Sequence, residues 1–284
     1  MTDSYEGFAR HIHACNNARL PDGRLPLRLR GVTLGWIDAG LLPALESHVS
    51  AGSGVTRGIE GGFELEDTGI LEKLGGSLAA NGHFRFRNEA FDILAEPHGP
   101  TLGRIDRGAL PGFGLIASGV HVNGLVELPD GPHLWVGRRA ADKLLDPNKL
   151  DHLVAGGIAA GYGPMQTLVK EGEEECSLPA ALAAQAVKVA EITYRMQRPE
   201  GLRRDLLHCY DLTLPPGWIP TPNDGEVAGF HLLPLSQVFT AVRDTSDFKF
   251  NVNLVLIDLF LRRGLLDETR AEGRQLRAGL KGAL

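Results

Sequence analysis

Cysteine is scarce in this chain of 284 residues, and no apolar run is long enough to cross a bilayer. The three cysteines, Cys15, Cys176 and Cys209, are too few and too scattered for a disulfide framework or a zinc cluster. The longest apolar stretch, residues 252–261, is interrupted by two polar residues, whereas a spanning helix needs about 20 apolar residues. These absences predict a soluble protein of a reducing compartment, with no membrane partner.

An excess of positive charge is also lacking. The chain has 29 Lys and Arg against 35 Asp and Glu, a formal net charge of −6. Proteins that bind nucleic acid by neutralising phosphates usually show the opposite balance. The N-terminus has no basic segment followed by an apolar core, which is the pattern of a secretory signal. We therefore expect a cytoplasmic protein that does not bind nucleic acid.

Glycine, by contrast, is plentiful, with 36 residues, and predicts many turns. Hydrophobic residues make up 43% of the chain, enough for a sizeable core. The length suits two domains, and the run GALPGFG at residues 108–114 clusters glycine and proline between patterned segments. We expect a smaller α+β domain at residues 1–110 and a second domain at residues 111–284.

Hydrophobic periodicity predicts the elements of both domains. In the first domain we expect strands at residues 29–36 and 63–66, strands around a turn at Asn88 within residues 84–94, and helices at 39–49 and 70–80. In the second we expect strands at residues 115–128, 133–139, 150–157 and 206–214 and one ending at 233, and helices at 164–176, 180–190, 236–241 and 250–263. The last helix has apolar positions on one face. That face suits packing on its own domain or in a homodimer interface.

The segment at residues 156–178 carries clustered carboxylates. Glu171, Glu174 and Glu175 stand at i, i+3 and i+4 on a predicted helix, so they share one face. They lie toward its C-terminal end, where the helix dipole disfavours anions. One explanation is a solvated acidic face. The other is a site for Mg²⁺, which binds through one or two carboxylates plus substrate phosphates. The glycine-rich turn and Pro164 before the helix favour the second.

This segment resembles the Nudix box, whose pattern is Gly, five residues, Glu, seven residues, then Arg-Glu-aliphatic-any-Glu-Glu-any-Gly-aliphatic. Gly156, Glu171, Glu174, Glu175 and Leu178 match it in register. The resemblance implies that the three glutamates ligate Mg²⁺ or Mn²⁺. It also implies an α+β fold: a Nudix α/β/α sandwich with a mixed sheet, preceded here by the smaller α+β domain.

Four positions depart from the box: Tyr162 replaces the first Glu, Lys170 the Arg, Gly172 an aliphatic residue and Ser177 the closing Gly. In the family, the first Glu and the Arg largely orient the loop against the helix. Lysine keeps the charge of arginine but not its planar fork. The implied ligands are thus retained while their supporting residues are altered. Catalysis and a binding module without turnover both remain open.

The likeness extends over residues 110–245. It is carried by Arg138 and Arg139 after an apolar strand, by PNKLDHLVAGG before the box, and by YDLTLPPGWIPTPNDGEVAGFHLLPLSQV at residues 210–238. These resemble the Nudix branch related to fungal thiamine pyrophosphokinase proteins, which has an extra N-terminal domain. The branch implies hydrolysis of a small-molecule diphosphate, best matched by a damaged, thiamine diphosphate-like compound that is cut to the monophosphate and phosphate. The alternative is a nucleoside diphosphate linked to another group.

Five residues outside the three glutamates are further candidates. Glu226 is either a turn acid or an additional ligand or general base, which would make it a fourth catalytic carboxylate. Arg138 and Arg139 are either solvent-facing or contacts to substrate phosphates. Lys170 is a substrate-contact candidate at the Arg position of the box. Trp218 is either buried with its loop or stacked on a heteroaromatic substrate.

Overall fold

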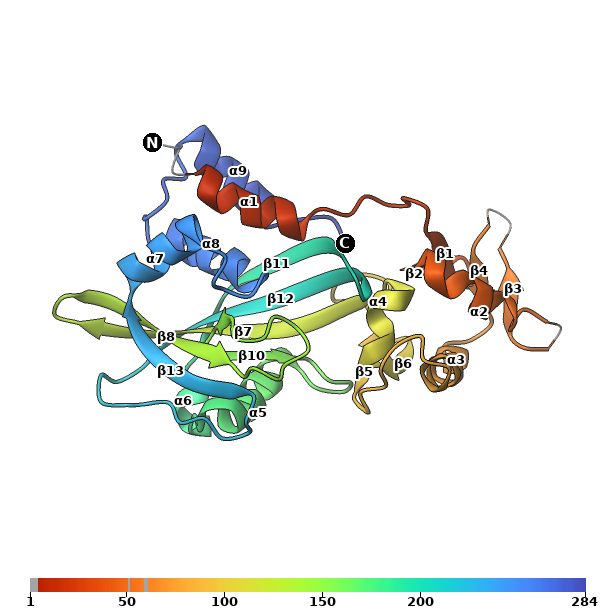
Figure 1. Cartoon of the computed structure of the whole chain (residues 1–284), viewed down its shortest axis with the longest axis horizontal. Helices are drawn as coiled ribbons and strands as arrows, with labels where there is room; N and C mark the ends of the chain where they lie inside the picture. Colours follow the sequence, from red (N-terminus) through yellow and green to blue (C-terminus); the bar gives the residue numbers. More distant parts are fainter. Residues whose placement is uncertain (1–4, 51, 59–60) are drawn as a thin grey trace.

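The computed structural model describes residues 5–50, 52–58 and 61–284, and its strands form a large sheet, a smaller sheet and a two-stranded ribbon (Figure 1). The large sheet has the order β11-β12-β7-β8-β13. Its strands are β7 (Ile116–Leu128), β8 (Gly131–Arg139), β11 (Val187–Arg198), β12 (Gly201–Thr213) and β13 (Val227–Pro234). Two short strands complete it: β9 (Leu150–Asp151) pairs with β8, and β10 (Val154–Gly157) pairs with β7.

The large sheet is mixed, as predicted, because β12 runs parallel to β7 while the other pairings are antiparallel. One face packs against α5 (Pro164–Cys176) and α6 (Ala180–Ala183). The other is covered by α1 (Glu6–Cys15), α7 (Leu235–Asp244), α8 (Val252–Arg262) and α9 (Ala271–Gly279). Figure 1 shows the two helical layers on opposite sides of the strands. The predicted α/β/α sandwich is confirmed.

The smaller unit has its own sheet, of order β2-β1-β4-β3, and its own core. Its strands are β1 (Leu25–Leu29), β2 (Val32–Ile37), β3 (Val55–Arg57) and β4 (Phe63–Leu65), and its ribbon is β5 (Ala90–Ile93) with β6 (Gly103–Asp106). Its helices are η1 (Ala39–Leu41), α2 (Leu42–Glu46) and α3 (Gly69–Ala80). The helical turns η2 (Arg107–Ala109) and α4 (Leu110–Phe113) lead into β7. The predicted smaller α+β unit before the sandwich is confirmed.

Helix α1 precedes the smaller unit in sequence but packs on the sandwich. The Phe8 ring is fully buried, with its centroid 4.8 Å from that of Phe239 on α7 and 6.0 Å from that of Phe260 on α8. The core of the smaller unit begins at Leu27 and ends at Leu115. The boundary at residue 110 stays a prediction, with the first helix structurally part of the second unit.

Several element predictions are wrong, mostly where the backbone reverses. Residues 29–36 form two strands rather than one, because Arg30 and Gly31 both adopt positive φ in a tight hairpin turn. Of residues 84–94 only 90–93 form a strand, and of residues 39–49 only a 3₁₀ turn and α2 are helical. Residues 180–190 do not form one helix: α6 ends at Ala183, and the edge strand β11 begins at Val187. Pairing with β12 overrides the helical propensity of the alanine-rich run.

Helix α8 matches the predicted position but is not amphipathic. Every residue from Val252 to Leu261 is buried. Asp258 is only 1% exposed and pairs with Arg262 on the same helix and with Arg277 on α9. Of the two alternatives for this helix, the structure shows packing on its own domain. Within the described ranges, no helix is both long and apolar enough to cross a membrane.

The docking of α1 yields a stability prediction. Replacing Phe8 by Ala should lower the free energy of unfolding of the sandwich by about 3–5 kcal/mol, because a fully buried aromatic ring leaves a cavity. Phe86→Ala is the control, since that ring is 52% exposed. Urea denaturation followed by tryptophan fluorescence measures both. Equal midpoints for the two variants would contradict the packing of α1 on the sandwich.

Candidate active site

The residues at the two ends of helix α5 have backbone conformations suited to starting and ending a helix. Gly163 is extended before the helix, its N–H donates to Gln166 Oε1 at 2.8 Å, and Pro164 occupies the first turn. Ser177 follows the helix in the left-handed conformation, with φ of 56°. That conformation favours glycine, which explains why the Nudix pattern has Gly at this position. Gly172 is buried, and a Cβ there would lie 3.1 Å from Leu178 Cδ2.

The acidic face of α5 docks on the backbone of β10. A Cβ on Gly156 would lie 2.4 Å from Glu171 Cγ, so only glycine permits this approach. Glu175 is buried, and its Oε2 accepts the N–H of Ala155 at 2.9 Å. Two of the three clustered glutamates are thus positioned by direct contact with β10, the strand on which the box begins.

Lys170 lies between the two glutamates nearer to solvent. Its Nζ is 3.0 Å from Glu171 Oε1 and 2.5 Å from Glu174 Oε2. Partial burial opposes the charged ammonium, but these two hydrogen bonds raise the pKa of Lys170. In this structure Lys170 therefore neutralises part of the acidic cluster, and Glu175 is left without a cationic partner among the described ion pairs.

The environment of Glu175 fits a hard cation. Burial raises the pKa of this carboxyl to about 8, and the nearby carboxylates of Asp151, Glu171 and Asp224 act in the same direction, against the Ala155 hydrogen bond. A buried acid in a cluster of acids stays ionised only if positive charge is supplied. Oxygen donors are what Mg²⁺ and Mn²⁺ prefer. The chemistry of these oxygen donors therefore fits either ion, although the three box glutamates are not among the described side chains whose ligand atoms converge within 4.8 Å.

A small cavity beside α5 brings three of the predicted residues together. Glu175, Glu226 and Arg139 line it, from α5, the loop before β13 and the end of β8 respectively. The other lining residues are Gly137, Asp151, His152, Ala155 and Val227. Sequence reasoning missed Asp151 and His152, although both lie in the run PNKLDHLVAGG just before the box.

Glu226 is both a turn residue and a cavity residue. Its N–H donates to Asp224 Oδ1 at 2.8 Å, so the turn at Asp224 and Gly225 is present. Its carboxylate pairs with Lys143. Although burial opposes ionisation, the hydrogen bond and charge of Lys143, with the charges of two arginines, lower the pKa of Glu226. The carboxylate is thus ionised where it faces the cavity.

The remaining candidates lie in different places. Arg139 Nη1 pairs with Asp151 Oδ2 at 2.8 Å, and its other nitrogens donate to backbone carbonyls, so its guanidinium is committed within the chain. Arg138 Nη1 donates to the carbonyl of Asn148 at 2.9 Å, and Arg138 is absent from the cavity lining. Trp218 is half-buried against the core beneath α5, also outside that lining.

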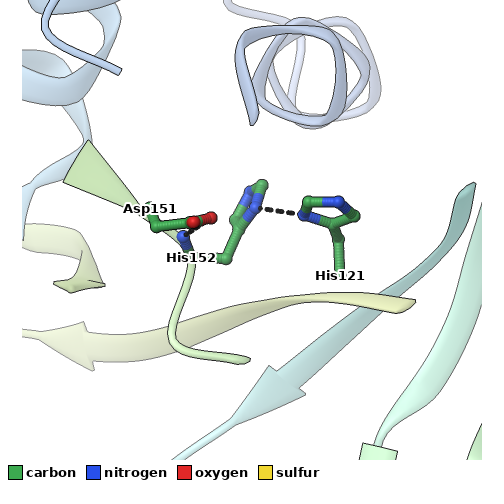
Figure 2. A group of neighbouring side chains, drawn as sticks. All are labelled: His121, Asp151 and His152. Carbon is green, nitrogen blue, oxygen red and sulfur yellow. Dashed lines mark hydrogen bonds between the residues drawn. The ribbon is translucent and has the colours of Figure 1, made fainter. Parts of the chain in front are cut away.

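Figure 2 shows a buried group of three side chains, His121, Asp151 and His152. Asp151 and His152 also line the cavity. Among the described residues, this trio is the one group of three His, Cys, Asp or Glu side chains whose possible metal-ligating atoms all lie within 4.8 Å of one another. The two imidazoles meet through their Nδ1 atoms at 3.0 Å. Asp151 already pairs with Arg139 at 2.8 Å and with Lys249 at 3.4 Å.

This group fits a neutral histidine pair better than a metal site. Burial lowers the pKa of His152 to about 4 and also lowers that of His121. Two neutral imidazoles share one proton across the Nδ1 contact. A divalent ion here would lie beside the positive charges of Arg139 and Lys249. The carboxylate of Asp151 would be the one negative group of this set to balance all three cations. The charges disfavour that arrangement.

Comparisons with known proteins agree with the resemblance of the box. No protein-family model matches the chain. Over 180 residues, 63% of this chain, it is 43% identical to "Nudix hydrolase 24, chloroplastic" and 41% identical to "Nudix hydrolase 20, chloroplastic", both of Arabidopsis thaliana. The matches cover 49% and 48% of those proteins. The chain thus spans about half the length of the curated relatives it matches.

Among solved structures, the chain is similar to DR0079 from Deinococcus radiodurans. The sequence identity is 20%, the TM-score is 0.47, and the match covers 59% of this chain and 97% of that one. The Nudix resemblance of the sequence is supported by the two curated relatives that carry the family's name. Their similarity does not distinguish the fungal thiamine pyrophosphokinase-related branch.

The histidine pair gives a prediction about acid stability. The folded pKa of His152 lies below the unfolded value near 6.5, so only the unfolded state gains this proton as the pH falls from about 6.5 to about 4. Between pH 7 and 4.5 the wild type should lose about 2 kcal/mol more stability than His152→Asn. Urea denaturation at each pH measures the difference. Parallel pH profiles would contradict a buried neutral His152.

Proposed function

We propose that this protein is a Mg²⁺- or Mn²⁺-dependent Nudix hydrolase that cleaves an organic diphosphate. The observation that carries the proposal is the docking of the in-register box on β10, with Glu175 buried and Glu226 across the same cavity. The similarity to named Nudix hydrolases supports it.

Each acidic residue has a distinct proposed part. Glu171, Glu174 and Glu175 would hold the divalent ion. When bound, such an ion neutralises phosphate oxygens and lowers the pKa of a coordinated water. Glu226, kept ionised beside Lys143, would accept a proton from the attacking water as general base. Lys170 reaches two of the box carboxylates and from there would contact substrate phosphates.

For the substrate, we propose a thiamine diphosphate-like compound, such as a damaged cofactor, cut to the monophosphate and phosphate. The support is the resemblance of residues 210–238 to the fungal thiamine pyrophosphokinase-related branch. In this proposal residues 1–110 are the extra domain of that branch and residues 111–284 are the hydrolase domain, with α1 packed on the latter. Trp218, in the loop beside α5, would stack on the heteroaromatic ring.

A ligand-binding module without turnover is the second candidate, favoured by one observation. Lys170 already bridges Glu171 and Glu174, so an incoming metal ion must displace its ammonium or share those oxygens with it. Arginine at this position in the family pattern has a planar guanidinium instead. Measurement of phosphate release alongside calorimetric binding separates catalysis from binding alone.

The catalytic assignment predicts a sharp contrast along α5. Glu174→Gln and Glu175→Gln should each lower Mg²⁺-dependent phosphate release by about 100-fold or more, since loss of one group that stabilises transition-state charge costs on that order. Glu173→Gln is the matched control: it removes the same charge from the same helix at an exposed position. Full activity in both test variants would overturn the proposed metal site.

The substrate class predicts the products. With a panel of thiamine diphosphate, oxidised thiamine diphosphates, ADP-ribose and a dinucleoside polyphosphate, the highest kcat/KM should fall on a thiamine compound, with the monophosphate and phosphate as products. Mass spectrometry identifies the products. A preference for ADP-ribose or the dinucleotide would instead place the protein with hydrolases of nucleoside diphosphates linked to another group.

A further inference from the structure

The ribbon of the smaller unit packs directly against the loop that leads into α5. The N–H of Ala160 donates to the carbonyl of Ala90 on β5 at 2.8 Å. The N–H of Gly161 donates to Asp92 Oδ2 at 3.0 Å. In Figure 1 the loop after β10 extends toward β5 of the ribbon. The ribbon is therefore part of the surroundings of the box.

Arg107 follows this ribbon and lies at the end of β10. A Cβ on Gly157 would lie 2.6 Å from Phe91 Cζ and 3.4 Å from Arg107 Cζ. The neighbouring Gly156 is the residue against which Glu171 packs. Because Gly156 and Gly157 have no side chains, the acidic face of α5 and the Arg107 side chain both pack close to the same end of β10.

The Arg107 side chain is oriented but not enclosed. Its Nη1 donates to Glu89 Oε2 at 2.9 Å, and its guanidinium carbon lies 5.5 Å from the centroid of the Phe91 ring. The side chain is still 50% exposed. A guanidinium held by one carboxylate and one ring keeps donors that face solvent, since it has five N–H groups in a rigid fork.

The charge of Arg107 acts on the candidate site. Together with Lys143 and Arg139 it lowers the pKa of Glu226, against the effect of burial. Arg139 is engaged by Asp151 and by backbone carbonyls, and Lys143 by Glu226. A diphosphate brings several negative charges that need donors beyond the metal ion, and guanidinium groups match phosphate oxygens in bidentate geometry.

We propose that Arg107, from the smaller unit, binds a phosphate of the organic diphosphate and so completes the active site of the sandwich. This inference rests on the proposed function. It assigns the smaller unit a role in phosphate recognition. The reactive carboxylates come from one unit and the phosphate-binding guanidinium from the other.

Arg57 provides a matched control for the test. It also belongs to the smaller unit, pairs with a glutamate, Glu46, and lies over a phenylalanine ring, Phe63, at 4.5 Å. Its side chain is 45% exposed. It is located on β3, at the far edge of the smaller sheet. Arg57→Ala therefore removes the same interactions and the same charge at a distance from α5.

Two measurements are made on the full-length protein: KM and kcat for the best diphosphate substrate with Mg²⁺, and calorimetric binding of methylenediphosphonate with Mg²⁺. Arg107→Ala should raise KM and weaken methylenediphosphonate binding by about tenfold or more, with a smaller change in kcat. Arg107→Lys should give an intermediate loss, because it keeps the charge without the fork. Arg57→Ala should remain within twofold of wild type. If Arg107→Ala perturbs folding, Arg107→Gln replaces it.

The outcomes separate this inference from the proposed function. If the wild type hydrolyses the substrate and the Arg107 variants keep the wild-type KM and the wild-type affinity for methylenediphosphonate, the proposed phosphate contact is overturned. The proposed hydrolase activity then still stands. Loss of methylenediphosphonate binding in the Arg107 variants supports the contact even if wild type hydrolyses no compound, a result that would overturn only the proposed hydrolase activity. Equal losses in the Arg107 and Arg57 variants indicate a general charge effect and overturn the inference.

Discussion

The close approach of two elements to the backbone of β10 is the constraint on which the candidate site depends. Helix α5 reaches this strand where Gly156 has no side chain, and the β5–β6 ribbon reaches it where Gly157 has none. A methyl group at either position would collide with Glu171 or with Phe91. These two glycines therefore fix the distance between the acidic helix, the large sheet and the smaller unit at once.

The buried carboxylates near that contact differ in whether a cationic side chain pairs with them. On the α5 side, Glu175 is buried without a cationic partner among the described ion pairs, and its pKa rises. On the β8 and β9 side, Asp151 has two partners, Arg139 and Lys249, which hold the pKa of its carboxyl well below the usual range although burial opposes this. A cation is therefore favoured beside Glu175, whereas the negative charge of Asp151 is already balanced by its two partners.

Local patterns predicted much of this arrangement, and contacts between distant segments explain what they missed. The helix at residues 164–176 was predicted to the residue, because proline, glycine and carboxylate spacing all act within one segment. By contrast, β11 follows an alanine-rich run and forms only by pairing with β12. The histidine pair joins residues 31 positions apart. Arg107 precedes the box by some 50 residues, so no spacing rule connects it to Glu171.

The altered residues of the Nudix pattern lie beside a contact between the loop before α5 and the smaller unit. In that pattern a Glu at position 162 and an Arg at position 170 hold the loop against the helix. Here Tyr162 is exposed, and Lys170 contacts only the acidic cluster among the described ion pairs. The loop is held from outside instead, since Asp92 accepts the N–H of Gly161 and Ala90 accepts that of Ala160. The ribbon thus supplies hydrogen bonds to the loop beside the positions where the pattern has its first Glu and its Arg.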